Sequence, residues 1–161
     1  MNTQNSTITK LAETALMAAL CYVSFTFLQI KIPVPGGDAT SIHIGNAFCV
    51  LAALLIGGVY GGLSGAIGMG IADLMDPVYI TGAPKTFVLK FCIGLITGLV
   101  AHKIAKINES TDKKYVFKWS VIASVAGLAF NVVADPIVGY FYTMYIPVSY
   151  THLRAHERLA N

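Results

Sequence analysis

The sequence predicts an all-α integral membrane protein, a bundle of about five transmembrane helices, and two observations lead to this. Of the 161 residues, 55% are hydrophobic and 12% are charged, whereas soluble domains carry roughly 25% charged residues. Apolar runs long enough to cross a bilayer also recur along the chain, separated by turn-forming or lysine-rich segments. The length suits one compact bundle, which we expect over residues 1–147.

The first expected span covers residues 11–30 and holds one charged side chain, Glu13, near its start. About 20 apolar residues suffice to cross the hydrocarbon core as a helix. The segment that follows, Lys31 to Asp38, contains two prolines and two glycines and cannot continue a helix. We therefore expect a loop, and the segment from Lys31 to Ser41 would act as a lid over a site.

Residues 42–74 contain one full charge, Asp73. As a single helix they would extend about 50 Å, well beyond a core of about 30 Å. The glycine-rich middle, Gly57 to Gly62, instead predicts a tight turn between two short spans at 42–57 and 60–75. One steeply tilted helix is the alternative.

Two further spans are expected at 86–104 and 119–134. The first follows a proline-bounded loop at 76–85, and the second ends or kinks at Asp135-Pro136. The segment between them, 102–118, contains five lysines. Because lysine-rich loops face the cytoplasm, we expect a cytoplasmic N-terminus in a bacterial plasma membrane.

The last fourteen residues differ from the rest of the chain. Both arginines, Arg154 and Arg158, lie there, and the nine lysines all precede them. This stretch resembles a translated sequencing-adaptor read-through, so we expect 148–161 to be a non-native tail. A short soluble tail is the alternative.

Ionisable and amide side chains in the spans gather at one end of the expected bundle, in the outer third of the bilayer. Polar groups at membrane depth are unfavourable and usually serve a partner or a function. A structural Asp73–Lys90 pair is the alternative, and Asp76 and Lys85 are expected in open loop. The expected substrate-binding residues are His43, Asn46, Asp73, Lys90, Asn131 and Asp135.

The sequence contains no pattern of a catalytic site. It has no HExxH motif, no Walker A motif and no Cys/His nucleophile arrangement. The three cysteines match neither a zinc site nor a redox pair, so no metal and no cofactor are expected. A basic stripe with interleaved aromatic residues is also missing, which argues against nucleic acid as a partner.

The order of several short motifs resembles the S components of energy-coupling-factor (ECF) vitamin transporters, in the riboflavin-type and related group. They begin with Ala15-Leu-Met-Ala-Ala19, Lys31-Ile-Pro-Val-Pro-Gly, His43-Ile-Gly-Asn46 and Leu51-Ala-Ala-Leu-Leu-Ile-Gly-Gly58-Val-Tyr-Gly-Gly62. They continue with Gly68-Met-Gly-Ile-Ala-Asp73-Leu, Ala83-Pro-Lys-Thr-Phe-Val-Leu-Lys90 and Asn131-Val-Val-Ala-Asp135-Pro.

The resemblance implies a six-helix fold, truncated here because the sixth helix would lie where the tail stands. It implies high-affinity binding of a vitamin or precursor near the outer face. It also implies, as partners, a transmembrane coupling protein and two ATPase subunits, with Ala15 and Ala19 as the docking surface. The vitamin stays open among riboflavin, pyridoxine, pantothenate, thiamine precursors and cobalt-corrin precursors.

Two other functions remain as alternatives. A stand-alone secondary carrier or channel fragment would need a polar path to both faces, and the inner halves of the spans are nearly all apolar. A structural membrane subunit would have no ligand at all.

Overall fold

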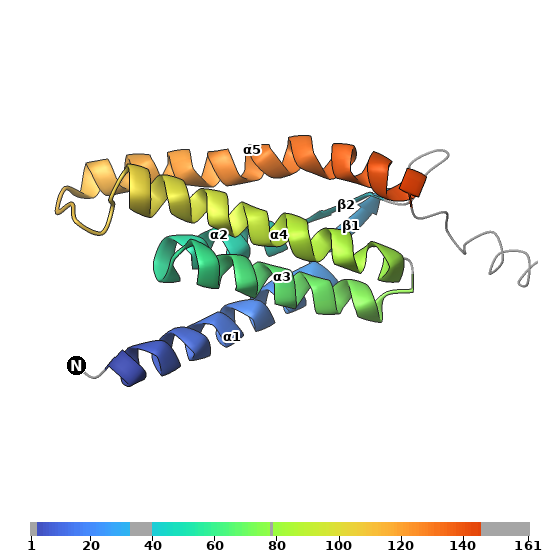
Figure 1. Cartoon of the computed structure of the whole chain (residues 1–161), viewed down its shortest axis with the longest axis horizontal. Helices are drawn as coiled ribbons and strands as arrows, with labels where there is room; N and C mark the ends of the chain where they lie inside the picture. Colours follow the sequence, from blue (N-terminus) through green and yellow to red (C-terminus); the bar gives the residue numbers. More distant parts are fainter. Residues whose placement is uncertain (1–2, 33–39, 78, 146–161) are drawn as a thin grey trace, which may run out of the picture.

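The computed structural model describes residues 3–32, 40–77 and 79–145, which form an antiparallel bundle of five α-helices and one two-stranded sheet (Figure 1). A short 3-10 turn at Ile80–Gly82 leads into the fourth helix, and a π-helical stretch at Leu99–Ile104 follows it. The elements are α1 (Thr3–Phe27), β1 (Gln29–Ile32), β2 (Thr40–His43), α2 (Gly45–Ile56), α3 (Gly58–Met75), α4 (Ala83–Gly98) and α5 (Lys113–Tyr145).

Three helical stretches within these ranges are long and apolar enough to cross a membrane: Thr7–Phe27, Ile80–Ile104 and Lys113–Tyr142. They correspond to the first, fourth and fifth expected spans, so the predicted fold class is confirmed. The second span is shorter than expected, because α2 has 12 residues and extends only about 18 Å. Residues 42 and 43 belong to β2 instead of to the helix.

The predicted glycine turn lies between α2 and α3. Gly57 has a φ of 97°, a conformation that glycine adopts easily because it has no Cβ. The chain therefore forms two helices here, and the alternative of one tilted helix is wrong.

The centre of the bundle is α3, which contacts α1, α2 and α4. Two glycine rows meet where α3 crosses α4. A Cβ added at Gly94 would overlap the backbone of Gly62, and one added at Gly98 would overlap that of Gly58. Such small-residue rows let helix backbones approach closely, which stabilises helix pairs in lipid.

The helix α5 lies along one side of the bundle and packs mainly on α4 (Figure 1). It begins at Lys113, inside the expected 102–118 loop, and continues through Pro136 to Tyr145. Of the two expectations at Asp135-Pro136, an end or a kink, the end is therefore wrong. Its 33 residues extend about 50 Å, which exceeds the hydrocarbon core and leaves the lysine-rich start outside it.

The segment after α1 differs from the expected plain loop, because an antiparallel strand pair frames it. Gln29 pairs with His43 and Ile32 pairs with Thr40. Residues 33–39, the centre of the expected lid, and the expected tail at 148–161 lie outside the described residues.

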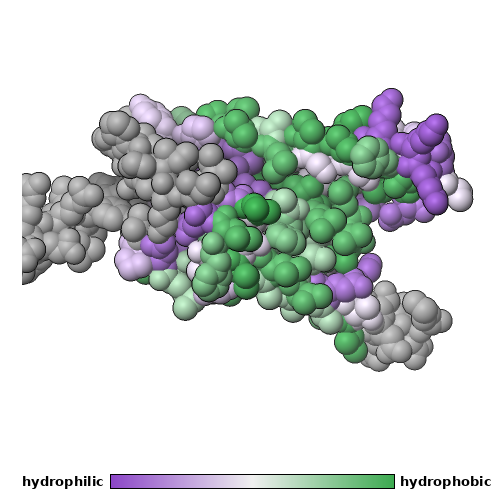
Figure 2. All heavy atoms as spheres, turned by 180° about the vertical axis from the view of Figure 1, so that it is seen from behind, coloured by the Kyte–Doolittle hydropathy of each residue, from purple (hydrophilic) through white to green (hydrophobic). Residues whose placement is uncertain are grey.

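The connections alternate between the two ends of the bundle as the sequence predicts. Figure 1 shows the strand pair, the α3–α4 connection and the end of α5 at one end, named here the hairpin end. The start of α1, the α2–α3 turn and the lysine-rich α4–α5 connection lie at the other. Figure 2 shows a hydrophobic surface over the middle and hydrophilic residues toward the ends, the pattern of a membrane-spanning bundle.

Candidate functional site

Two lysines of α4 reach α5 at the hairpin end. Lys90 is 6% exposed, and its Nζ lies 3.3 Å from Asn131 Oδ1. Lys85, in the first turn of α4, forms an ion pair with Asp135, with 3.0 Å between Nζ and Oδ1. The two contacts have different chemistry, because Lys85 has a carboxylate partner whereas the more deeply buried Lys90 has a neutral amide.

Asp73 is a third buried charge at this end, in the last turn of α3. It is 3% exposed, and the Thr86 side chain hydrogen-bonds to it. Because Lys90 donates to Asn131, these two charges have separate hydrogen-bond partners within the described residues. The alternative of a direct Asp73–Lys90 pair is therefore not what the structure shows.

The strand pair brings Gln29 and His43 directly opposite each other. Side chains opposite each other in an antiparallel pair lie on the same face of the sheet. Gln29 Oε1 and His43 Nδ1 are both buried and have no hydrogen-bond partner in the described part of the chain. Asn46 Oδ1, in the first turn of α2, is in the same condition. Buried polar atoms without a partner are rare and suggest a missing ligand or water.

Burial is the main cause that lowers the pKa of His43 to about 4, and the nearby Lys90 charge lowers it further. Asp135 acts in the opposite direction. The imidazole is therefore neutral at physiological pH, with one nitrogen available as an acceptor.

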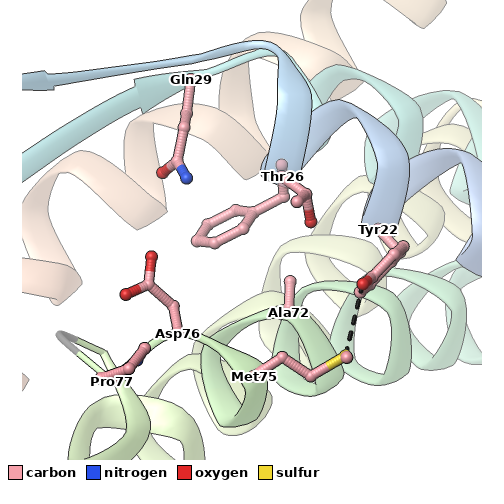
Figure 3. Close-up of a pocket in the computed structure, with 8 residues that line it drawn as sticks. Tyr22, Thr26, Gln29, Ala72, Met75, Asp76 and Pro77 are labelled. Carbon is pink, nitrogen blue, oxygen red and sulfur yellow. Dashed lines mark hydrogen bonds between the residues drawn. The ribbon is translucent and has the colours of Figure 1, made fainter.

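A cavity of about 310 Å³ opens beside this cluster, between the ends of α1 and α3 (Figure 3). Phe25 is a shared wall, because it lines the cavity and its ring also meets the His43 ring edge-on, with centroids 4.5 Å apart. The cavity is lined by Tyr22, Phe25, Thr26, Gln29, Ala72, Met75, Asp76 and Pro77.

The six residues expected from the sequence all lie at the hairpin end. A hydrogen bond joins Lys90 to Asn131, and charge interactions link Lys90 to Asp73, Asp135 and His43. For Asn46, the side-chain oxygen Oδ1 has no hydrogen-bond partner within the described residues.

Sequence reasoning missed two polar residues of this region. Lys85 was expected in open loop, but the helix starts at Ala83 and holds it against α5. Gln29 was counted as part of the first span. The alternation of polar and apolar residues from Gln29 to Ile32 was the signal for a strand.

The two residues expected to dock the coupling protein lie on the outer face of α1. Ala15 and Ala19 are exposed, whereas Thr14 and Ala18 are buried against the bundle. Large apolar side chains stand beside them, with Leu16 62% exposed and Leu20 36% exposed. This face is therefore free to meet lipid or another membrane helix.

Residues 5–155 match the family model of the ECF-type riboflavin transporter, S component. The chain belongs to this family. The match extends past residue 148, where the expected tail begins.

A curated protein of Pyrococcus woesei, described as an uncharacterized protein in a gap 3' region, is 32% identical over 76 residues. The similarity covers 47% of this chain and 49% of that protein, so the chain spans about half the length of its relative. No solved structure matches the chain.

Family membership confirms the resemblance read from the motif order. S components are non-catalytic, substrate-binding membrane subunits whose transport is energised by a separate ECF module. The alternative of a stand-alone carrier is therefore not supported. Among the described residues, no group of three or more His, Cys, Asp or Glu side chains is placed so that it could hold a metal ion.

Proposed function

We propose that this S component captures a flavin-type vitamin from outside the cell at its hairpin end. One observation carries the proposal most directly. The buried Lys90 ammonium has three N–H donors, but within the described residues it makes one hydrogen bond, to the amide oxygen of Asn131. A buried charge without a full set of partners is strongly unfavourable, so a ligand that supplies acceptors would be bound tightly.

Three other buried atoms at the hairpin end have no hydrogen-bond partner within the described residues, and they add a second requirement for the ligand. Gln29 Oε1, His43 Nδ1 and Asn46 Oδ1 can each accept a hydrogen bond. A ligand that fits must therefore carry N–H or O–H donors as well as acceptors. The pyrimidine-dione edge of a flavin has both, with carbonyl oxygens next to an N–H group, and the family description names riboflavin.

The lysine distribution supports the orientation. The α4–α5 connection carries Lys103 and Lys106, the start of α5 carries Lys113, Lys114 and Lys118, and all five are exposed. This end would face the cytoplasm, together with the N-terminus, so the site would open to the outside.

The exposed Ala15 and Ala19 support a docking role for α1. Small side chains between larger ones let a second helix approach closely. We assign this face to the transmembrane coupling protein, which would transmit the work of two ATPase subunits. The chain has no nucleotide-binding motif of its own.

A binding screen tests the function. Purified protein in detergent is titrated into riboflavin, whose own fluorescence reports binding, and other vitamins and their precursors are tested by calorimetry. We expect saturable binding of riboflavin with a Kd below about 1 μM. Lys118→Met, at the opposite end, serves as a control and should bind equally well. The absence of binding for every flavin and vitamin tested would contradict the proposal.

A further inference from the structure

The first turns of α5, far from the hairpin end, combine basic and apolar side chains on one exposed face. Lys114 and Lys118 are four positions apart and therefore lie on the same side of the helix. Val121 and Val125 continue the same line in steps of three and four positions. Both lysines are exposed, Val121 is 47% exposed and Val125 is 60% exposed. Phe117, between the lysines, is 73% exposed. We name these five residues the basic face of α5.

The acidic side chains nearby have partners other than the lysine side chains of this face. Glu109 forms an ion pair with Lys106, with 3.6 Å between Oε2 and Nζ. Asp112 Oδ1 accepts a hydrogen bond of 2.9 Å from the Lys114 backbone N–H and so caps the helix. Within the described residues, the Lys114 and Lys118 side chains thus have no carboxylate partner. Like charges at this spacing repel each other, so an anion bound between them would be stabilising.

The length of α5 determines where this face meets the membrane. The helix has 33 residues and extends about 50 Å, so about 20 Å of it lies beyond a hydrocarbon core of about 30 Å. Lys114 and Lys118 lie in its first two turns, which suits the level of the lipid headgroups, and Val121 and Val125 lie deeper. Figure 2 shows hydrophilic residues gathered at this end of α5 and a hydrophobic surface along its middle.

We propose that the basic face of α5 binds anionic phospholipids. The lipid phosphate lies between Lys114 and Lys118, whose ammonium groups donate hydrogen bonds to its oxygens. The acyl chains lie along Val121 and Val125, and Phe117 packs at the junction between headgroup and chains. The lipid therefore presents charge and hydrocarbon in the same order as the helix does. This binding does not depend on which vitamin the hairpin end takes.

The arrangement of the helices favours a lipid over an acidic protein surface as the occupant. The proposed docking residues, Ala15 and Ala19, belong to α1, which packs on α2 and α3, whereas α5 packs mainly on α4. Figure 1 shows α1 and α5 on opposite sides of the bundle. A coupling protein seated on α1 would therefore leave the basic face of α5 in contact with the bilayer.

The single tryptophan of the chain provides a local reporter. Trp119 directly follows Lys118 and is half-buried, so lipids that carry bromine in their acyl chains quench its fluorescence when they lie beside it. The full chain is reconstituted into vesicles of phosphatidylcholine and phosphatidylglycerol, with one or the other lipid brominated. The ratio of the two quenching curves gives the preference for the anionic lipid beside Trp119.

Two double variants separate the basic face of α5 from the general charge of this end. The test variant is Lys114→Gln with Lys118→Gln. The matched control is Lys103→Gln with Lys106→Gln, which removes two exposed lysines from the neighbouring connection. Both variants lose the same charge, and only the first loses it from the basic face.

We expect the wild type to prefer phosphatidylglycerol at least about fivefold, because one lysine near an anionic surface contributes about that factor. The test variant should fall to within about twofold of no preference, and the control should stay within about twofold of the wild type. Salt at 1 M should remove the wild-type preference, since screening then acts over about 3 Å. Equal quenching by brominated phosphatidylcholine alone in all three proteins shows that Trp119 keeps its place and that the variants are folded.

Three outcomes would overturn the proposal. A wild type without preference would mean that the lysines serve another partner, such as an acidic protein surface. Equal loss of preference in the test variant and in the control would mean that only the net charge of this end matters. A test variant that keeps the wild-type preference would exclude Lys114 and Lys118 as the phosphate ligands. Riboflavin binding is measured separately, so none of these results bears on the proposed function.

Discussion

At the scale of single residues, the two α4 lysines differ in a way that bears on function. Lys85 is 24% exposed and has a carboxylate partner that is 46% exposed. Such partly exposed ion pairs contribute little to stability. Lys90 is buried and has an amide partner, so its charge is the one that a ligand would satisfy.

Lys90→Met should therefore separate binding from stability. We expect riboflavin affinity to fall by about 100-fold, as when a buried charged hydrogen bond is lost. The thermal midpoint should not fall, because replacing a poorly partnered buried charge by an apolar side chain is often neutral or stabilising. Lys85→Met should weaken binding less than about tenfold. Fluorescence titration and thermal melts measure both effects. Wild-type affinity in Lys90→Met would refute this role.

The half-buried His43 predicts a pH-dependent stability. Its folded pKa of about 4 lies below its ordinary value of 6.5, so between these values the unfolded chain binds the proton more readily. The neutral imidazole's contribution is thus complete above about pH 6.5 and is lost as the pH falls toward 4. Thermal melts of wild type and His43→Gln from pH 7.5 to 4.5 should show the wild-type midpoint falling further than that of the variant. A constant difference between the two would contradict this.

The sequence predicted the residues of this cluster that interrupt apolar runs, such as Lys90 and Asn131, because polar groups in lipid are conspicuous. Gln29 and Lys85 were missed for a physical reason. Both lie at boundaries between elements, where polar residues are common and their contacts depend on the local turn.

At the scale of elements, the contact between α3 and α4 depends on glycine. The Gly58/Gly62 row faces the Gly94/Gly98 row with no room for a Cβ. The sequence alone does not show that these two rows meet. The strand pair was not predicted, because each strand has four residues and so short a segment gives little periodic signal.

Gly94→Ala should destabilise the bundle, because the new methyl group would overlap the Gly62 backbone, which cannot rotate away. Gly70→Ala on α3 is the matched control. There the added Cβ would lie 3.5 Å from the Phe87 ring, an ordinary contact, and alanine favours the helix by about 0.5–1 kcal/mol. Thermal melts in detergent should show a lower midpoint for Gly94→Ala and an equal or higher one for Gly70→Ala. Equal effects of the two substitutions would mean that the close approach is not required.

At the scale of the whole molecule, the two proposed functional surfaces are separate. The proposed binding site lies at the hairpin end, and Ala15 and Ala19, the proposed docking residues, lie on the exposed face of α1. The sequence predicted this arrangement in outline, since helix periodicity and lysine counts determine ends and faces. It could not predict that α2 is too short to cross alone or that α5 continues past Pro136, because tertiary packing decides both.

The separation predicts that docking can be lost while binding is kept. In a transporter reconstituted with its coupling protein and ATPases, Ala15→Phe and Ala19→Phe should reduce uptake by at least about tenfold, because a bulky ring keeps the helices apart. Riboflavin affinity should stay within about twofold. Val125→Phe is the control, since Val125 is 60% exposed on α5. Full uptake in the alanine variants would contradict the docking role.

The central claim is that the polar hairpin end faces the outside and holds the ligand, and accessibility labelling tests it most directly. Asp135→Cys and Lys106→Cys stand at opposite ends and are both exposed at their side chains. The native Cys21 and Cys49 are buried, and Cys92 is replaced by serine. In right-side-out vesicles, a membrane-impermeant maleimide should label Asp135→Cys, and riboflavin should slow that labelling, while Lys106→Cys should react only after permeabilisation. If intact vesicles showed labelling of Lys106→Cys and no labelling of Asp135→Cys, that result would contradict the account.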